Sequence, residues 1–264
     1  MSSEDVFDSK LSKKFDKKIQ EIIDRIGLDR KTQDEVFDTS TLHTIEKLIS
    51  SRVIDMIDFP ISTGKEGNVF RAKTPDGGFV ALKIYRTSTS TFKHIAKYIV
   101  GDPRFKSSHK NRREIIFEWT KKEFKNLQRA NKAGVKTPKP IRKINNVLVM
   151  EYIGNDKGSA PELKDTILKN PDRTYRLLIK YIKSLYIKAK IVHGDFSQFN
   201  ILIHKNNPYV IDLGQAVLLE HPQADEFLRR DLKNISRYFS TKYGIKTDFN
   251  AIYESITKES KFNT

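Results

Sequence analysis

Apolar residues recur every three or four positions in the first part of the chain, which is the spacing of one face of an amphipathic helix. Gly27 ends the first such segment, residues 7–26, whose apolar positions are Leu11, Phe15, Ile19, Ile22, Ile23 and Ile26. A second helix is predicted from about Thr41 to Ile54, on Leu42, Ile45, Leu48, Ile49 and Val53. We therefore predict a helical N-terminal extension over residues 1–56.

From about residue 57 the apolar pattern changes to short runs separated by turn residues, which is typical of strands. Ile61 leads into a glycine-containing turn and then into Val69-Phe70. After the turn Pro75-Asp76-Gly77-Gly78, residues 79–85 are predicted to form the next strand. A two-residue turn at 145–146 predicts a hairpin of strands over 141–144 and 147–153. A long helix is predicted over 112–133, where a glycine ends it.

These patterns predict three parts and an α+β fold. Residues 57–153 form a small antiparallel β-sheet lobe with one main helix. Within it, residues 86–111 have poor periodicity and mix hydroxyl groups with Lys and His. They are predicted to form a mobile, basic loop with a short helix near 93–99. Residues 154–264 form a helical C-terminal lobe, with helices over 173–190 and 227–239.

The most informative stretch lies between these last two helices, where apolar residues at 191–192 and 201–203 enclose a polar loop. The loop contains His193, Asp195 and Asn200, and Asp212 follows on the next predicted strand. Such a pattern is typical of phosphoryl transfer, with one aspartate to take a hydroxyl proton and an asparagine and a second aspartate to hold a metal ion. Alternatively, His193 and Asp195 simply cap a strand and a turn. The spacing of Asn200 and Asp212 favours catalysis.

A glycine-containing turn between two predicted strands indicates a lid over phosphate groups, because glycines allow backbone amides to approach an anion closely. The residues expected to contact a nucleotide there are Ser62, Gly64, Lys65, Glu66, Gly67 and Val69. The alternative is an ordinary hairpin. Lys83, inside the apolar strand that follows, favours the lid, since a lysine is costly there unless it meets a carboxylate or a phosphate.

Glu123 is the predicted partner of Lys83. It lies within the apolar stripe of helix 112–133, and an acid on a buried face needs a cation; a position at the edge of the stripe is the alternative. Where the second hairpin strand meets the helical lobe, the backbone of Glu151 and Ile153 is expected to bind an adenine edge. We call the polar loop over residues 193–200 the catalytic loop. Asp231, on helix 227–239, either braces the backbone of this loop or faces solvent.

Charge is unevenly distributed along the chain. The whole sequence has 49 Lys and Arg against 33 Asp and Glu, a net charge of +16, and residues 83–143 alone contain 18 against 4. A solvated lysine-rich surface is the alternative, but so large a local excess favours a polyanionic partner such as RNA. The cations expected to face it are Lys106, Lys110, Arg112, Arg113, Lys121, Lys122 and Lys125.

The composition also excludes several classes of protein. There is no Cys, so neither disulfides nor thiolate metal sites are possible, and a reducing compartment is expected. The N-terminal residues lack the basic and apolar regions of a secretory signal. No apolar run approaches the roughly 20 residues that span a bilayer. We therefore expect a cytoplasmic protein without a membrane partner.

Several segments resemble the Rio family of atypical protein kinases. They are Ser62–Val69, Ala81–Tyr85, Trp119–Phe124, His193-Gly194-Asp195 with Asn200, and Ile211–Val217. The resemblance extends from about residue 40 to 240. It is to the first Rio subgroup, because the STGKEGNVF loop is typical of that subgroup and no winged-helix segment is apparent.

The resemblance implies a two-lobed protein-kinase-like fold that binds ATP with Mg²⁺ or Mn²⁺. Lys83 would hold the α- and β-phosphates, with Glu123 positioning it. Asp195 would be the catalytic acid/base, and Asn200 and Asp212 would bind the metal. The resemblance further implies ATP-dependent serine/threonine phosphorylation, including autophosphorylation, or ATP hydrolysis, and a role in maturing the small ribosomal subunit through its precursor and RNA.

The chain departs from ordinary protein kinases in having HGD for HRD, DLG for DFG and no A-P-E segment after the DLG, which puts recognition of a peptide substrate in doubt. Two alternatives stay open: a small-molecule phosphotransferase of the aminoglycoside or choline kinase type, and an ATP-binding scaffold on pre-ribosomal RNA.

Autophosphorylation is predicted within residues 86–111. The candidate acceptors are Ser88, Ser90, Ser107 and Ser108. The phosphoacceptor and the oligomeric state are not determined by the sequence.

Overall fold

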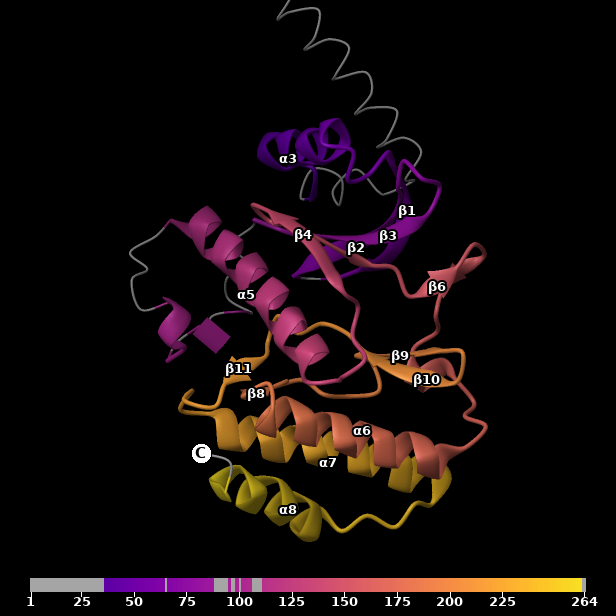
Figure 1. Ribbon diagram of the computed structural model, residues 1–264, viewed down its shortest axis with the longest axis vertical. Coiled ribbons are helices and arrows are strands. Elements are labelled where there is room, and N and C mark those ends of the chain that lie inside the picture. The colour runs from indigo at the N-terminus through magenta and orange to yellow at the C-terminus, as the bar shows by residue number, and fades with distance from the viewer. Residues whose placement is uncertain are drawn as a thin grey trace, which may run out of the picture.

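Two lobes make up the described part of the chain, a sheet lobe above and a helical lobe below (Figure 1). The computed structural model describes residues 36–64, 66–87, 95, 98–99, 101–105 and 111–262. The predicted helix over 7–26, the lid residue Lys65 and the four candidate phosphoacceptor serines lie outside the described residues. The two-lobed α+β arrangement is the fold class that the sequence predicts.

The upper lobe is built on a five-stranded antiparallel sheet in the order β1-β2-β3-β5-β4. Its strands are β1 (Met56–Thr63), β2 (Gly67–Lys73), β3 (Phe79–Tyr85), β4 (Pro140–Ile144) and β5 (Val147–Glu151). β4 and β5 form the predicted hairpin. Its turn residue Asn145 has a φ of 48°, a left-handed conformation that asparagine tolerates better than most residues.

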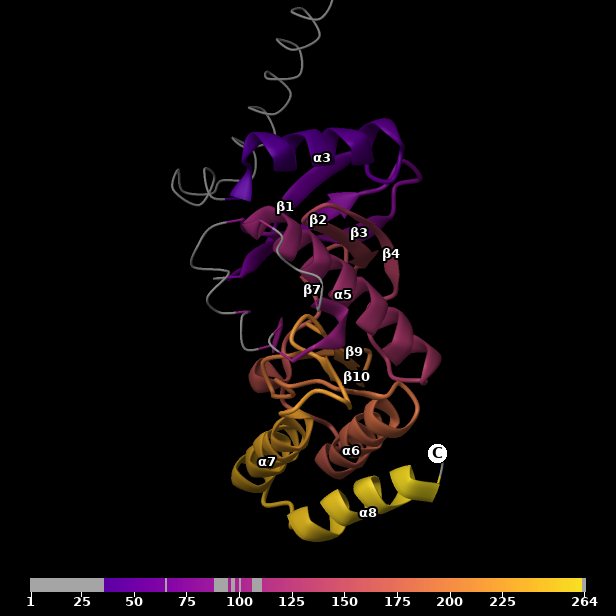
Figure 2. The ribbon, with the colours of Figure 1, turned by 90° about the vertical axis from the view of Figure 1, so that its left-hand side faces the viewer.

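Helices cover both faces of this sheet, α3 (Thr39–Ser50) on one and α5 (Arg112–Lys132) on the other (Figures 1 and 2). Successive side chains of a strand point to opposite faces. In β3, Val80, Leu82 and Ile84 therefore pack in the core under α3. Ala81 and Tyr85 pack in the core that includes α5, and Lys83 lies on their side. The alternation of β3 thus directs Lys83 toward α5 and the space between the lobes.

The ends of α3 differ from the prediction. The Asp38 carboxylate accepts a hydrogen bond from the amide of Thr41 at 2.8 Å, so the helix begins at Thr39. Arg52 has a φ of 56°, which no α-helix accommodates, and the predicted end at Ile54 is therefore too late. By contrast, α5 matches its predicted range within one residue.

The lower lobe contains α6 (Pro171–Ile187), α7 (Ala224–Tyr243) and α8 (Phe249–Phe262). Short antiparallel pairs lie between them and the sheet lobe: β8 (Ile191–Val192) with β11 (Val217–Leu218), and β9 (Ile201–His204) with β10 (Asn207–Val210). α7 is longer than predicted and ends at Gly244 in the left-handed conformation. α8 is absent from the prediction, although Phe249, Ile252, Tyr253 and Ile256 have helical spacing.

Four short elements complete the described structure. β6 (Gly154–Asn155), β7 (Gly158–Ser159) and the 3₁₀ turn η2 (Leu163–Asp165) lie between β5 and α6, where the two lobes are connected, and the 3₁₀ turn η1 (Pro103–Phe105) lies between β3 and α5. Among the described residues, no helix combines the length and the apolar character needed to cross a membrane.

Candidate active site

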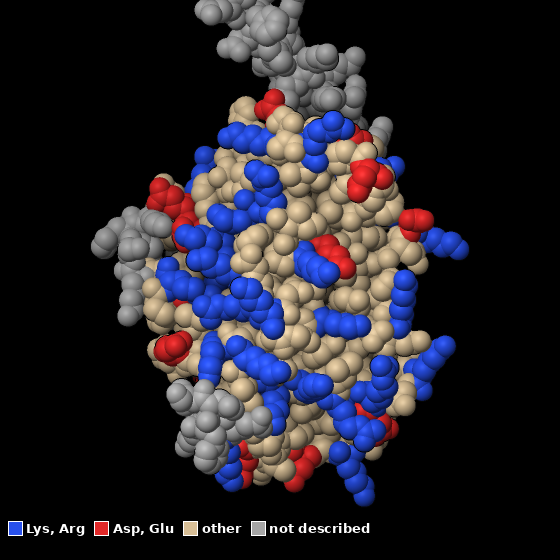
Figure 3. Space-filling model, viewed as in Figure 1, with Lys and Arg blue, Asp and Glu red and all other residues tan. Residues whose placement is uncertain are grey.

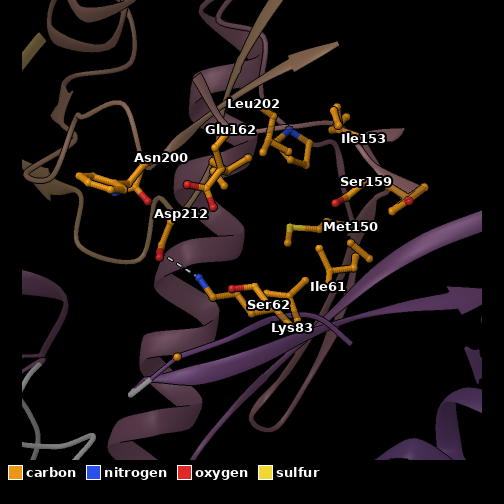
Figure 4. Close-up of a pocket in the computed structure, with 18 of the residues that line it drawn as sticks. Ile61, Ser62, Lys83, Met150, Ile153, Ser159, Glu162, Asn200, Leu202 and Asp212 are labelled. Carbon is orange, nitrogen blue, oxygen red and sulfur yellow. Dashed lines mark hydrogen bonds and ion pairs between the residues drawn. The ribbon is translucent and has the colours of Figure 1, made fainter. Parts of the chain in front are cut away.

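A cleft of about 670 Å³ lies between the two lobes. It is lined by residues from the lid, β3, the connection between the lobes, η2 and the catalytic loop. Of the predicted site residues, those lining it are Ser62, Gly64, Glu66, Gly67, Val69, Lys83, Glu151, Ile153, Asn200 and Asp212. Figure 4 shows Asn200 and Asp212 at one end of this cavity, with Ile153 and Ser159 at the other. The cleft therefore has a polar end and a more apolar end.

Lys83 lies at the polar end, between two carboxylates. Its Nζ is 3.0 Å from Glu123 Oε1 and 2.9 Å from Asp212 Oδ1, and the second contact is drawn in Figure 4. Burial alone would lower the pKa of Lys83, but the two carboxylates outweigh it and hold this pKa well above its usual value. The lysine is therefore charged, and the predicted pair with Glu123 is present.

Glu123 lies behind Lys83 and does not line the cleft. Its side chain is 1% exposed, and its second oxygen accepts a hydrogen bond from the Tyr85 hydroxyl. Burial raises the pKa of this carboxyl above its ordinary value, while Lys83 opposes that effect. Glu123 would thus act on a nucleotide only through Lys83, by holding the ammonium group in place.

Asp195 and Asn200 are joined within the catalytic loop. The Asn200 Nδ2 donates to the Asp195 side-chain Oδ2 at 2.8 Å and to its backbone carbonyl at 2.9 Å. Asn200 lines the cleft. Asp195 is partly exposed and is not among the lining residues.

His193 supports the loop from below and is buried. Its Nδ1 accepts from the amide of Asp195 at 3.3 Å, so its Nε2 carries the proton and donates to the carbonyl of Ile211 at 3.1 Å. The histidine therefore connects the catalytic loop to the segment just before Asp212. Its part is to position these residues.

Asp231 of α7 holds the backbone of the same loop, which is the first of the two alternatives that the sequence leaves open. Its two oxygens accept from the amide of Gly194 at 2.8 Å and from the amide of Phe196 at 2.9 Å. The side chain is buried, and burial raises its pKa to about 6. The amides before and after Asp195 are thus fixed by one carboxylate.

Asn126 of α5 has a comparable part and was missed by the sequence analysis. It is fully buried, and its Nδ2 donates to the carbonyls of Leu213 at 2.8 Å and Ala216 at 3.0 Å. α5 therefore holds both Lys83, through Glu123, and the segment that follows Asp212. The available signal was an asparagine three residues after Glu123, on the apolar face of the helix.

Asp212 adopts a left-handed backbone conformation, with a φ of 58°. Such a conformation is unfavourable for most residues other than glycine, and residues held in it are concentrated at functional sites. Burial raises the pKa of the Asp212 carboxyl, but the ion pair with Lys83 outweighs burial and the pKa is lowered. Asp212 is therefore an anion at neutral pH, with its carboxylate in the cleft.

The structure shows two features of the lid that the sequence did not predict. A Cβ atom on Gly67 would lie 2.4 Å from the carbonyl oxygen of Ile84, so this glycine is required by the close approach of β2 to β3.

Glu66 extends into the cleft, where its Oε1 is 3.4 Å from Gln215 Nε2. Burial, reinforced by Asp212, raises the pKa of Glu66 to about 7. The lid thus brings an acid as well as backbone amides to the polar end.

At the other end of the cleft, two backbone groups of the connecting segment are already bonded. The amide of Glu151 donates to the carbonyl of Lys139 at 2.8 Å, and the carbonyl of Ile153 accepts from the amide of Ala160 at 2.9 Å. Both residues line the cleft, and their contact with an adenine edge stays a prediction.

Glu162 also lines the cleft and was not singled out from the sequence. Figure 4 shows it pointing into the cavity near Asn200 and Asp212. Its Oε2 is 2.9 Å from the Nζ of Lys164. No local signal identifies it, since its position depends on a bridge between residue 162 and Leu202 that joins segments far apart in the sequence.

Comparison with known proteins gives a consistent family. The RIO domain matches residues 68–252 of this chain. The RIO-type serine/threonine-protein kinase Rio1 of Haloferax volcanii is 44% identical over 227 residues, covering 86% of this chain and 78% of that protein. The Rio1 of Methanocaldococcus jannaschii is 37% identical over 248 residues, covering 94% and 84%. The human serine/threonine-protein kinase RIO1 is 36% identical over 263 residues, and the chain spans only 46% of its length.

Solved structures share the fold. The Rio2 kinase from Chaetomium thermophilum superposes with a TM-score of 0.65 at 22% identity, covering 81% of this chain and 66% of that chain. Its ADP/Mg²⁺-phosphoaspartate complex gives a TM-score of 0.62 at 19% identity, with coverages of 84% and 70%. At these identities the likeness concerns the two-lobed fold alone.

Proposed function

Because this chain belongs to the RIO family of serine/threonine-protein kinases, we propose that its cleft binds ATP with a divalent cation and transfers the γ-phosphoryl group to a serine hydroxyl. The observation that supports this most directly is the charged Lys83 between Glu123 and Asp212, at the polar end of a cleft of about 670 Å³. A cation that is fixed in this way can bind phosphates without rearranging.

We assign the proton transfer to Asp195. Its carboxylate accepts the proton of the acceptor hydroxyl as the hydroxyl oxygen bonds to the γ-phosphorus, while the bond from that phosphorus to the β–γ bridging oxygen breaks and ADP leaves. The Asn200 amide fixes one oxygen of Asp195, and Asp231 fixes the flanking backbone. Water in place of the serine would give ATP hydrolysis by the same route.

The donor set fits Mg²⁺ or Mn²⁺. These hard cations favour oxygen ligands, and Mg²⁺ is commonly held by one or two carboxylates with phosphate oxygens and water. Asp212 supplies a carboxylate at the polar end and Asn200 an amide oxygen. Among the described residues no cluster of three or more His, Cys, Asp or Glu side chains could hold a metal ion by itself. When bound, the cation neutralises charge on the β- and γ-phosphates.

The other end of the cleft suits a nucleoside. The carbonyl of Glu151 and the amide of Ile153 would bind the adenine edge, with Met150 and Ile61 lining the space beside it. Glu162 lies between that end and Asn200, so its carboxylate is placed to accept hydrogen bonds from ribose hydroxyls. Exposed polar residues in the lid, Ser62 among them, would cover the phosphates.

We propose a small ribosomal subunit precursor and its RNA as the partner, through the basic residues of 83–143. The structure corrects one of the seven cations that the sequence analysis expects to face the RNA. Lys122 is buried, with its Nζ 3.4 Å from the carbonyl of Tyr98 and 4.2 Å from the Trp119 ring centroid, so it cannot contact RNA. Lys106 and Lys110 lie outside the described residues. Lys125 on α5 is exposed.

Transfer of label from γ-labelled ATP tests the proposed reaction. The protein should label itself, and mapping of the phosphorylated residue identifies the acceptor. Asp195→Asn should reduce turnover by about 10²–10⁴-fold, since it removes a general base, while binding of the nucleotide is kept. Lys83→Met should impair both turnover and binding. Near-normal turnover in Asp195→Asn would disprove the assignment, whereas nucleotide binding without any turnover in the parent protein would favour an ATP-binding scaffold.

A further inference from the structure

A second hollow lies apart from the cleft, where the C-terminal ends of α5 and α6 meet. Its volume is about 340 Å³, and it shares no lining residue with the cleft. Its lining residues are Arg129, Lys132, Ala133, Lys188, Ala189 and Lys190. We call it the α5–α6 hollow. Four of its six lining residues are basic, and none is acidic.

Among the described residues, these four basic side chains have no hydrogen-bond or ion-pair partner. Arg129, Lys132 and Lys188 are exposed, and Lys190 is partly exposed. Neighbouring cations raise one another's electrostatic energy, so a bound anion would lower the energy of all four. The hollow is thus complementary to a multiply charged anion.

Helix geometry explains only part of this cluster. The carbonyl end of a helix favours cations, which accounts for Arg129 and Lys132 in the last turn of α5 and for Lys188 at the end of α6. Lys190 lies beyond its helix and has a φ of 55°, a conformation in which Gly or Asn is usual. Neither helix end explains why side chains from two helices meet at one hollow.

The lining argues for phosphates rather than for a protein surface. Protein interfaces depend on large buried anchors such as Trp, Tyr and Leu in pockets, and the apolar residues here are two alanines. The hollow also has no aromatic side chain on which a base could stack. Contacts of this kind bind the nucleic-acid backbone and carry no sequence information.

The hollow continues a larger basic surface. Lys125, Arg129 and Lys132 are four and three residues apart, so they lie along one face of α5. Figure 3 shows Lys and Arg side chains gathered in a band over α5 that continues over the lower lobe. The hollow is where this band passes from one lobe to the other, since α5 belongs to the upper lobe and α6 to the lower.

We propose that the α5–α6 hollow binds the phosphate backbone of an RNA strand and thereby anchors it to both lobes. The choice of RNA rests on the partner given under the proposed function, while the phosphate chemistry rests on the hollow itself. Each neutralised phosphate of a single strand releases counterions. The logarithm of the binding constant should therefore fall with the logarithm of the salt concentration, with a slope of about −0.7 for each phosphate contact.

The test measures binding of a fluorescein-labelled single-stranded RNA of mixed sequence by anisotropy, over a series of salt concentrations. The test variant carries Lys132→Glu and Lys188→Glu. The matched control carries Lys157→Glu and Lys246→Glu, two exposed lysines outside the hollow, so the net charge is the same. We expect the hollow variant to bind at least about ten-fold more weakly, with a slope smaller by about 1.4, and the control to change less than about two-fold.

A pair of neutral substitutions, Lys132→Gln and Lys188→Gln, guards against poor folding of the charge reversal, and the thermal unfolding midpoint of each variant is compared with that of the parent. The neutral pair should show the same smaller slope.

If the hollow variants bind RNA as the control does, the hollow is not the site, although the proposed partner stands. If the parent binds no RNA, both ideas fail. If polyglutamate of equal charge competes as well as RNA, the hollow binds an acidic protein and the inference is overturned.

Discussion

At the scale of single residues, the site depends on which charges share the polar end of the cleft. Lys83 is the one cation that the structure places between Glu123 and Asp212 there, and the acids nearby are only partly compensated by it. Burial and Asp212 together raise the pKa of Glu66 to about 7. Its protonation state therefore changes near neutral pH, at the place where we expect phosphates to bind.

Replacing Glu66 with Gln should make nucleotide affinity less dependent on pH. Below pH 7 the Glu66 carboxyl is mostly neutral and above it mostly ionised, so repulsion of phosphates should appear as the pH rises through 7. One added negative charge near phosphates at an intermediate dielectric is worth about 1 kcal/mol, or roughly five-fold in affinity.

The measurement is the dissociation constant of ADP without divalent metal, for the parent and for Glu66→Gln, from pH 6 to 8. Dividing the dissociation constant of the parent by that of the variant cancels the titration of the nucleotide itself. We expect a ratio near one at pH 6 that rises to roughly five at pH 8, with the variant binding more tightly. A ratio that stays constant over this range would mean that Glu66 does not face the phosphates.

At the scale of elements, two helices fix the catalytic segments from opposite sides. α5 holds the segment after Asp212 through Asn126, and α7 holds the catalytic loop through Asp231. Each uses one buried polar side chain to satisfy two backbone groups of a loop. Such a contact costs desolvation of the side chain, which is consistent with the raised pKa of Asp231. These loops are thereby held at some expense of stability.

The pH dependence of unfolding should report the cost at Asp231. Its folded-state pKa of about 6 exceeds the ordinary aspartate value of 3.8, so the folded state binds the proton more tightly. Stability contributed by this group is fully present below about pH 4 and is lost as the pH rises to about 6. The difference amounts to about 3 kcal/mol, at 1.36 kcal/mol for each unit of pKa.

Asp231→Asn provides the comparison, since asparagine does not titrate. The free energy of unfolding from urea titrations at several pH values should show the parent losing stability relative to the variant between pH 4 and 6, with a constant difference above pH 7. At neutral pH the variant should also turn over ATP more slowly, because an amide cannot accept from both loop amides with both of its polar atoms. A pH-independent difference in stability would contradict the burial of an ionised Asp231.

At the scale of the whole molecule, the cleft depends on both lobes. Lys83 and the lid come from the sheet lobe, and Asn200 and Asp212 come from the helical lobe. A ligand that contacts both lobes stabilises the folded protein in proportion to its affinity. The chain's division into an extension over 1–56 and lobes over 57–153 and 154–264 stays a prediction.

Saturation with Mg²⁺ and ATP should therefore raise the unfolding temperature. At one hundred times the dissociation constant the ligand adds about 2.7 kcal/mol, or about 5–10 °C for a chain of this size. Asp212→Asn should abolish the part of this shift that requires metal. Asparagine is chosen because it tolerates the left-handed backbone at residue 212 better than alanine does.

Differential scanning fluorimetry with ATP in Mg²⁺ and with ATP in EDTA separates the two parts. The parent should show a larger shift with Mg²⁺, and the variant should show the same shift in both. An undiminished Mg²⁺-dependent shift in Asp212→Asn would mean that the metal is held elsewhere.

The sequence by itself determined those features that depend on residues close together in the chain. Helical spacing sets α5 within one residue, and the turn at 145–146 sets the β4–β5 hairpin. The spacing of Asp195, Asn200 and Asp212 predicts a phosphoryl-transfer site, because that chemistry needs these groups in a fixed order along one loop and the strand after it. Lys83 and Glu123 were paired correctly, because each is a charged residue within an apolar segment and therefore needs a partner of opposite charge.

Only the tertiary structure decided which distant residues meet. Asn126 looked like a polar residue on a helix until its amide was seen to reach the segment after Asp212, and the position of Asp231 was open until α7 was placed beneath the loop. Lys122 belongs to the basic stretch by sequence, but packing buries it. The α5–α6 hollow joins lysines more than fifty residues apart. Spacing along the chain encodes local geometry, whereas burial and convergence of charge depend on how helices pack, which no short segment specifies.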